Sequence, residues 1–232
     1  MLLNVIAYSD YSDRGKAARD YIKTFDRISE HVFVVIAFSI SKSMTSYGMR
    51  CGAAILMAQK EESVREVEIV FEKAARAIWS NVNNAAMENF VTVVTDNKAA
   101  YEAEKDEYVD LLKERSDIFT SEADACGLEY YPYKEGFFVT VKIEDNNVRN
   151  AYHEALMKEH IYTVMVNKGI RLAVCTLPVD KCKGLAARMK KILDEVTTAW
   201  SENRMNDTAD EMRKQLHFIC CFIYTRRNEV RT

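Results

Sequence analysis

Residues 32–52 read VFVVIAFSISKSMTSYGMRCG, and this stretch decides the fold. It begins with an apolar run from Val32 to Phe38, rich in β-branched and aromatic residues and without a polar interruption. Such a run predicts a strand covered on both faces, as in a parallel α/β sheet. One lysine, Lys42, follows among serine and threonine residues. Because the carboxyl ends of parallel strands face the ligand crevice, this loop is the first candidate for a site.

Further strands and helices are predicted on both sides of this stretch. Upstream, Leu2 to Tyr8 forms a short apolar strand, and Asp13 can cap a helix from Arg14 to about Ile28. Downstream, Ala53 to Met57 forms another apolar strand. From Glu61 the apolar residues recur at helical spacing, which predicts helices over residues 61–78, about 85–94 and about 97–119.

After Gly127 the pattern is typical of a small α+β unit. It predicts strands over 136–143, 161–166 and 170–176 and helices over 147–159 and 179–200, with Pro178 near the start of the last helix. The tail, 206–232, contains an apolar, β-prone segment from Gln215 to Tyr224. That segment is either docked on the protein or an appendage with a tendency to aggregate.

The composition excludes several classes of protein. The formal net charge of −3 provides no basic surface for a nucleic acid. With Gly 7 and Pro 2, the chain has too few turn residues for an all-β sandwich or barrel. Neither GxxxxGK[ST] nor GxGxxG occurs, so no glycine-rich phosphate loop is present. The 48% hydrophobic content is ample for packed cores.

The cysteines and the apolar runs indicate the compartment. The six cysteines show no CxxC spacing and no interleaved histidines, so no metal site is predicted. No basic segment precedes a long apolar stretch, and no apolar run approaches the ~20 residues that span a bilayer. We therefore expect a cytoplasmic protein with free thiols and no membrane partner.

The loop around Lys42 has the side chains that a phosphate needs. Hydroxyl groups from Ser39, Ser41, Ser43 and Thr45 can donate to phosphate oxygens, and the Arg50 guanidinium can bind two of them. A lysine beside a bound phosphate cofactor can act as a nucleophile toward an aldehyde. On composition alone, an exposed lysine in an ordinary Ser/Thr loop is the alternative.

The spacing of this loop resembles a known segment. Ser39-x-x-Lys42, with Arg50 eight residues later and Gly52 after it, is similar to the Schiff-base segment of fold type I pyridoxal-phosphate-dependent aminotransferases of the aspartate and aromatic amino acid branch. The resemblance implies that Lys42 forms the Schiff base with pyridoxal 5′-phosphate and that Ser39 and Arg50 hold its phosphate. Tyr8, which follows a strand, matches the family's tyrosine that hydrogen-bonds the cofactor's phenolic oxygen; ending a core strand is its alternative role.

Two further segments match in order. Arg76 begins RAIWSN, which resembles the family's R-x-x-W-S-N, and Arg171 lies in GIRLA, which resembles its small domain. The resemblance implies that Arg171 binds the substrate α-carboxylate and that Arg76 crosses a homodimer interface to a dicarboxylic substrate. From the residues alone, Arg76 can instead pair with Glu72 four residues earlier.

The resemblance implies an α/β fold of type I with an incomplete large domain. Residues 1–110 would be a remnant of the large cofactor-binding domain and 111–205 the small carboxyl-terminal α+β domain. The implied function is transfer of an amino group from aspartate or an aromatic amino acid to a 2-oxo acid in amino acid metabolism. A truncated, non-catalytic homologue that acts as an inactive fragment or dimer partner is the alternative. A helical interaction module, with binding carried by the charged helices from Lys60 to Arg115, is another.

One position departs from the family pattern. The family has an aspartate three residues before the tyrosine, where this chain has Val5. A valine cannot keep a proton on the cofactor's pyridine nitrogen, which the electron-sink chemistry requires. We therefore expect cofactor binding with poor transamination, unless Asp10 acts as a substitute.

Overall fold

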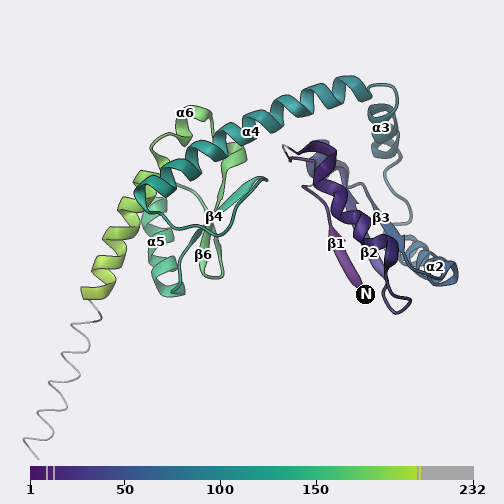
Figure 1. Cartoon of the computed structure of the whole chain (residues 1–232), viewed down its shortest axis with the longest axis horizontal. Helices are drawn as coiled ribbons and strands as arrows, with labels where there is room; N and C mark the ends of the chain where they lie inside the picture. Colours follow the sequence, from purple (N-terminus) through teal and green to yellow (C-terminus); the bar gives the residue numbers. More distant parts are fainter. Residues whose placement is uncertain (9, 13, 203, 205–232) are drawn as a thin grey trace, which may run out of the picture. The chain divides into compact units, whose positions relative to one another are not determined.

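The computed structural model describes residues 1–8, 10–12, 14–202 and 204, which form two compact units (Figure 1). The first unit holds Met1–Ser116 and Lys134–Phe137, and the second holds Asp117–Tyr133 and the residues from Phe138 onward. Helix α4 (Lys98–Cys126) contributes to both units, so the predicted boundary between residues 110 and 111 falls inside a continuous helix. The tail that the sequence set apart, 206–232, lies outside the described residues.

The first unit is built on a three-stranded sheet with the order β1-β2-β3. β1 (Leu2–Val5) runs parallel to β2 (Val34–Ser39), and β3 (Gly52–Met57) runs antiparallel to β2. The three strands predicted from the sequence are confirmed, and the first half of the central strand β2 is buried. The sheet is mixed rather than wholly parallel, because the chain returns from β2 to β3 without a crossover.

Gly52 closes the loop that joins β2 to β3. It pairs in register with Ser39, the last residue of β2. A Cβ atom at Gly52 would lie 2.4 Å from the Phe38 carbonyl oxygen, which only glycine avoids. The two ends of the loop that carries Lys42 are therefore held together by the sheet.

The helices of the first unit lie where the sequence predicts them, and one of them is a 3-10 helix. α2 (Glu61–Ile78) and α3 (Asn84–Val94) are confirmed, and Asn83 caps α3 by accepting from the backbone of Ala85 and Ala86. The segment η1 (Gly15–Arg27) is a 3-10 helix, where an α-helix was predicted. The predicted cap Asp13 lies outside the described residues, and the N-cap Arg14 makes no side-chain cap bond. The Tyr21 hydroxyl of η1 accepts a 2.8 Å hydrogen bond from Asn4 of β1.

The second unit contains an antiparallel sheet with the order β4-β6-β5. Its strands are β4 (Phe138–Lys142), β5 (Val164–Val166) and β6 (Gly169–Ala173). An isolated bridge joins Tyr130 to Val141 at the outer edge of β4. The α5 helix (Asn146–Lys158) is confirmed, with Asp145 as its N-cap.

The last predicted helix, 179–200, is interrupted. It divides into the short α6 (Val179–Cys182) and a longer helix over residues 185–202. Gly184 separates them with a φ of +76°, a conformation that glycine adopts without strain. Its backbone N–H donates to both carboxylate oxygens of Glu122 on α4, at 2.8 Å each. A partner distant in the sequence thus fixes the start of the longer helix.

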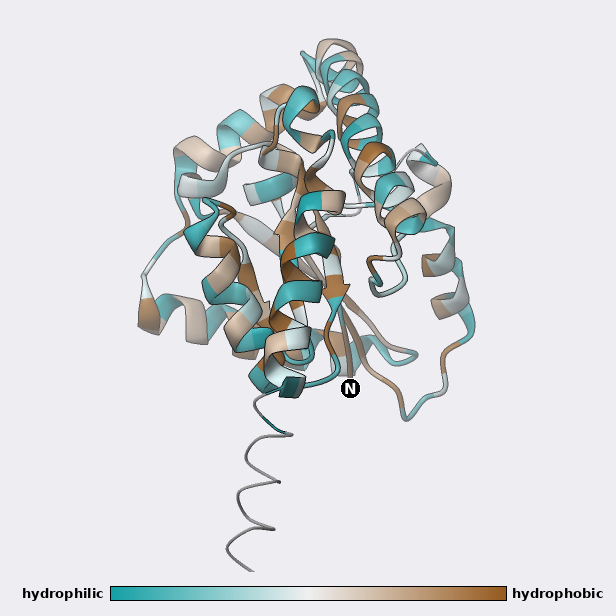
Figure 2. Cartoon of the chain, turned by 90° about the vertical axis from the view of Figure 1, so that its left-hand side faces the viewer, coloured by the Kyte–Doolittle hydropathy of each residue, from teal (hydrophilic) through white to brown (hydrophobic). Residues whose placement is uncertain are grey.

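Helices and strands of the second unit enclose a core whose largest side chains are fully buried. Among these are Phe119, Tyr152, Ile170 and Met189, and the Tyr152 hydroxyl donates a 2.9 Å hydrogen bond to the Met189 carbonyl. Figure 2 shows apolar residues concentrated on the strands, whereas the helices alternate between polar and apolar positions. Within the described ranges, no helix has both the length and the apolar character needed to cross a bilayer.

Candidate functional site

Lys42 lies one turn beyond the end of β2, in the short helix α1 (Ile40–Ser43). Ser39 is the N-cap of this helix, and its Oγ accepts a hydrogen bond from the Ser41 backbone N–H at 3.2 Å. The Ser43 hydroxyl donates to the Ser39 carbonyl at 2.9 Å. These two hydrogen bonds fix the turn that carries Lys42 directly after the end of β2.

Two tyrosines from other segments fix the turn around Lys42. The Tyr11 hydroxyl donates to the Lys42 carbonyl at 2.6 Å, and the Tyr101 hydroxyl of α4 donates to the Ser43 carbonyl at 2.8 Å. Burial raises the pKa of Tyr101 to about 12, so its hydroxyl stays protonated as a donor at neutral pH. Neither tyrosine was identified from the sequence, because nothing in their local pattern relates them to this loop.

Arg50 stands at the other end of the same loop, directly before β3. It caps the 3-10 turn η2 (Tyr47–Met49) in the left-handed conformation, with a φ of +54°. Its Nη1 atom donates to the Tyr47 carbonyl at 2.9 Å. The in-register pair of Ser39 and Gly52 therefore brings the predicted phosphate ligands Ser39 and Arg50 to the same end of the sheet.

Tyr8 follows β1 at this same end. Because β1 and β2 are parallel, with Val5 opposite Ala37, both strands deliver their next residues to one edge of the sheet. The Tyr8 ring packs edge-on against Phe137 with the ring centroids 5.0 Å apart. Phe137 also contacts Tyr11, whose hydroxyl binds the Lys42 carbonyl. In the first unit, the strands thus bring four predicted site residues to the same end of the sheet: Tyr8, Ser39, Lys42 and Arg50.

Val5 and Asp10 are both unsuited to the role of a buried cofactor carboxylate. Val5 is apolar and 64% exposed at the end of β1. The Asp10 carboxylate is largely buried and forms an ion pair with Arg19 at 2.9 Å. Asp10 therefore already has a cationic partner within the chain.

Arg76 lies in the last turn of α2 and contacts Ser80, the second residue after the helix. Its Nη1 atom donates to the Ser80 hydroxyl at 2.8 Å and to the Ser80 carbonyl at 3.3 Å. The ion pair with Glu72 that its position allows is not formed among the described residues. Ser80 has a φ of +69°, which brings its side chain and carbonyl back toward the helix end.

Arg171 belongs to β6 in the second unit. Its guanidinium carbon lies 4.5 Å from the centroid of the Phe138 ring on the neighbouring strand β4. Its Nε atom is buried and has no hydrogen-bond partner among the described residues. A buried donor without an acceptor carries a cost, and Arg19 and Arg115 each have a buried Nε of the same kind.

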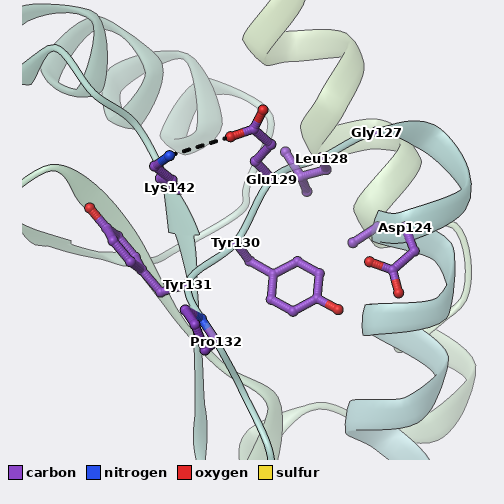
Figure 3. Close-up of a pocket in the computed structure, with 9 residues that line it drawn as sticks. Asp124, Gly127, Leu128, Glu129, Tyr130, Tyr131, Pro132 and Lys142 are labelled. Atoms are coloured by element: carbon purple, nitrogen blue, oxygen red, sulfur yellow. Dashed lines mark ion pairs between the residues drawn. The ribbon is translucent and has the colours of Figure 1, made fainter.

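An open cavity of about 690 Å³ on the second unit was not expected from the sequence (Figure 3). Its wall includes Tyr130, Tyr131 and Pro132 from the segment beside β4, with Asp124 and Lys142. Burial and a hydrogen bond to Asp124 raise the pKa of Tyr130. No group of His, Cys, Asp and Glu side chains that could hold a metal ion occurs in the described part of the chain.

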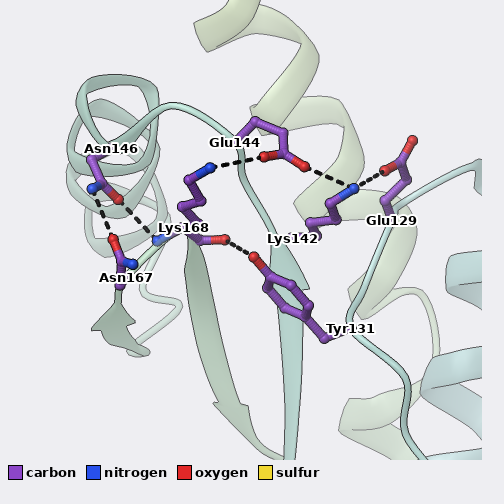
Figure 4. A network of polar contacts seen from close by, with 7 residues as sticks. All are labelled: Glu129, Tyr131, Lys142, Glu144, Asn146, Asn167 and Lys168. Atoms are coloured by element: carbon purple, nitrogen blue, oxygen red, sulfur yellow. Dashed lines mark hydrogen bonds and ion pairs between the residues drawn. The ribbon is translucent and has the colours of Figure 1, made fainter.

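Lys142 at the cavity wall belongs to a surface network of charges (Figure 4). It pairs with Glu144 at 2.8 Å and with Glu129 at 3.7 Å, and Lys168 pairs with Glu144 at 3.5 Å. The hydrogen bond to Glu144 raises the pKa of Lys142 and lowers that of Glu144. These contacts link the strand β4 to the turn before β6.

Comparison with known proteins relates this arrangement to solved structures. An aminotransferase from Anaerococcus prevotii is 33% identical with a TM-score of 0.77, over 82% of this chain and 46% of that one. An aromatic-amino-acid aminotransferase from Burkholderia pseudomallei, covalently bound to pyridoxal phosphate, is 19% identical with a TM-score of 0.64, over 82% and 47%. A putative aspartate aminotransferase from Leishmania major is 18% identical with a TM-score of 0.63, over 81% and 46%.

The chain spans just under half the length of these structures. No curated protein matches it significantly. The predicted α/β class, as a partial fold of type I, is confirmed. The family model for class I and II aminotransferases matches residues 5–189, which shows that the chain belongs to this family.

Proposed function

We propose that the chain carries the cofactor lysine and substrate arginines of an aminotransferase that moves an amino group from aspartate or an aromatic amino acid to a 2-oxo acid. Pyridoxal 5′-phosphate is the cofactor of the family. The observation that carries the proposal is the loop between β2 and β3, which presents an amine, a guanidinium and hydroxyl groups at one sheet edge.

The side chains at this edge fit a phosphate-bearing aldehyde. Ser39 and Arg50 have a hydroxyl and a planar guanidinium, which are donors suited to phosphate oxygens. Lys42 has the amine that condenses with an aldehyde, and its backbone is fixed through the Tyr11 hydroxyl. When bound, the cofactor supplies an electron sink for the charge that develops at the substrate Cα.

The proposed role of Lys42 has two parts. Its Nζ atom would anchor the cofactor, and the free Lys42 amine would move the proton at the substrate Cα as base and acid. Tyr8 is proposed to donate its hydroxyl to the phenolic oxygen of the cofactor. Both residues leave parallel strands at the same edge, which supports a shared site.

Arg171 is proposed to bind the α-carboxylate of the substrate. Support comes from its buried Nε atom, which has no acceptor among the described residues, and from the Phe138 ring that orients the guanidinium. Arg76 is proposed to bind the side-chain carboxylate of a dicarboxylic substrate across a homodimer interface. Its exposed guanidinium is held by Ser80 at the end of α2 and is accessible to a second chain.

A second candidate is a non-catalytic homologue that binds cofactor or a related chain without turnover. The observation that favours it is the apolar Val5 together with the ion pair that occupies Asp10. Without a carboxylate at the pyridine nitrogen, the electron sink is weakened.

Addition of pyridoxal phosphate to the purified chain tests the proposal. We expect a visible absorption band that is absent in Lys42→Ala and unchanged in Lys73→Ala, a matched change at an exposed lysine of α2. Borohydride reduction should fix the cofactor mass on the peptide that contains Lys42. Absence of any Lys42-dependent band contradicts cofactor binding. A band without 2-oxo acid formation from aspartate or aromatic amino acids favours the non-catalytic candidate.

A further inference from the structure

The ring of Tyr47 contacts the two cationic residues of the cofactor loop. The Nζ atom of Lys42 lies 4.3 Å from the ring centroid, and the guanidinium carbon of Arg50 lies 5.6 Å from it. Both distances are within the range of cation–π interactions. Tyr47 itself is 61% exposed, so its ring does not form part of a core.

This contact bears on the reactivity of the lysine. The face of an aromatic ring carries partial negative charge and attracts an ammonium group more strongly than a neutral amine. Condensation with an aldehyde needs the neutral amine, because only that form has a free electron pair. To react, the Lys42 amine must therefore give up its contact with the ring.

We propose that Tyr47 is a positioning residue whose ring holds the Lys42 side chain and slows its condensation with free aldehydes. This inference rests on the function proposed above for Lys42. Tyr47 limits reaction of the lysine with free aldehydes, and a cofactor gripped at Ser39 and Arg50 overcomes the limit by its high local concentration at the amine.

The ring can be removed without dismantling the loop. Arg50 binds the backbone carbonyl of residue 47, which every substitution retains. The strand pair of Ser39 and Gly52 and the hydrogen bond from Tyr11 to Lys42 do not involve the Tyr47 side chain. A change at Tyr47 therefore tests the ring and not the fold of the loop.

The test is the rate at which Lys42 becomes methylated in the cofactor-free chain. Formaldehyde condenses with a neutral amine with loss of water, cyanoborohydride reduces the product to a methylamine, and peptide mass spectrometry measures the rate at each lysine. The exposed Lys73 on α2 serves as the internal reference. Three variants are compared with the parent chain: Tyr47→Phe, which keeps a ring, and Tyr47→Leu and Tyr47→Gln, which remove it.

We expect Lys42 to be methylated about two- to fivefold faster in Tyr47→Leu and Tyr47→Gln than in the parent chain. This factor corresponds to the ~0.5–1 kcal/mol of an exposed cation–π contact. Tyr47→Phe should match the parent chain, and Lys73 should not change in any variant. Equal Lys42 rates in all chains, or a Tyr47→Phe rate as high as that of Tyr47→Leu, would overturn the inference. Faster rates at Lys42 and Lys73 together indicate a loosened fold and also count against it.

A parallel titration with pyridoxal phosphate separates this inference from the proposed function. A Lys42-dependent absorption band, with no effect of Tyr47→Leu on methylation, refutes the role of Tyr47 alone. If the methylation rate of Lys42 depends on the ring but no absorption band forms, the proposed function is refuted and the role of Tyr47 stands.

Discussion

The two sheets of this chain have the same number of strands but differ in how they are covered. In the second unit, Val139, Val141 and Ile170 are completely buried. In the first unit, Leu3 and Val5 of β1 and Ile55 of β3 are between 49% and 64% exposed. Strands β4 and β6 of the second sheet are well covered, whereas its short edge strand β5 is largely exposed. The first is fully covered only along the start of β2, so its stability depends more on protein that packs against its outer strands.

Substitution of one phenylalanine in each unit gives the largest expected contrast. Phe119→Ala in the second unit removes a ring with 0% exposure and should lower the free energy of unfolding by about 3–5 kcal/mol. Phe71→Ala on α2 of the first unit removes a ring that is 44% exposed and should cost less than about half of that. Urea unfolding followed by circular dichroism measures both. Equal losses would break the comparison between the units.

The prediction of structure from sequence worked best where one segment carried its own signal. The uninterrupted run from Val32 to Phe38 predicted the central strand, and Asn83 in a polar break preceded a helix that it caps. It failed at Gly184, since the helical spacing continues past this residue and the Glu122 carboxylate that binds it lies far away in the sequence. The exposure of β1 and β3 agrees with the incomplete large domain that the resemblance implies, although the apolar pattern of a strand does not by itself show whether the strand is covered.

For the candidate site, the sequence identified residues by spacing and the structure added their supports. Ser39, Lys42 and Arg50 were recognisable because they lie in one short stretch. The tyrosines Tyr11 and Tyr101 bind backbone carbonyls, a contact that leaves no pattern around Lys42. Tyr47 lies within the stretch, yet its contact with both cations depends on the η2 turn.

Each unit contains a tyrosine whose burial should make the stability of the fold depend on pH in the alkaline range. Burial raises the pKa of Tyr101 to about 12 and raises that of Tyr152 as well, against about 10 in the unfolded chain. Because the unfolded state loses these protons first, each tyrosine stabilises the fold below about pH 10, and this contribution is lost as pH rises through the folded pKa. We expect Tyr152→Phe to reduce the decline in stability above about pH 10 more than Tyr101→Phe does, since Tyr152 is fully buried.

The urea midpoint of each variant, measured across the alkaline range, gives the slope of its stability against pH. A larger change for Tyr101→Phe than for Tyr152→Phe would contradict the order of burial. Tyr21→Phe on η1 is a matched control at a tyrosine that is exposed.

The smallest expected effect on stability is at Val5. Val5→Asp replaces an exposed side chain and should alter the free energy of unfolding by no more than about 0.5 kcal/mol. It should nevertheless raise the rate of the half-reaction with aspartate, because a carboxylate here can keep the cofactor ring protonated. Val5→Asn, of similar size but without charge, is the control. No gain in rate for Val5→Asp would refute the electronic explanation of weak catalysis.

The close pairing of Ser39 with Gly52 has a consequence for how this site can change over evolution or by engineering. Lys42 is set by the first turn after β2, whereas Arg50 is set by the turn before β3. Gly48, between them, has open space around its α-carbon. A side chain added at residue 48 can therefore alter the surface of the proposed site while Ser39 and Gly52 keep the strands in register. The proposed affinity for an anion can be changed in this way without rebuilding the sheet.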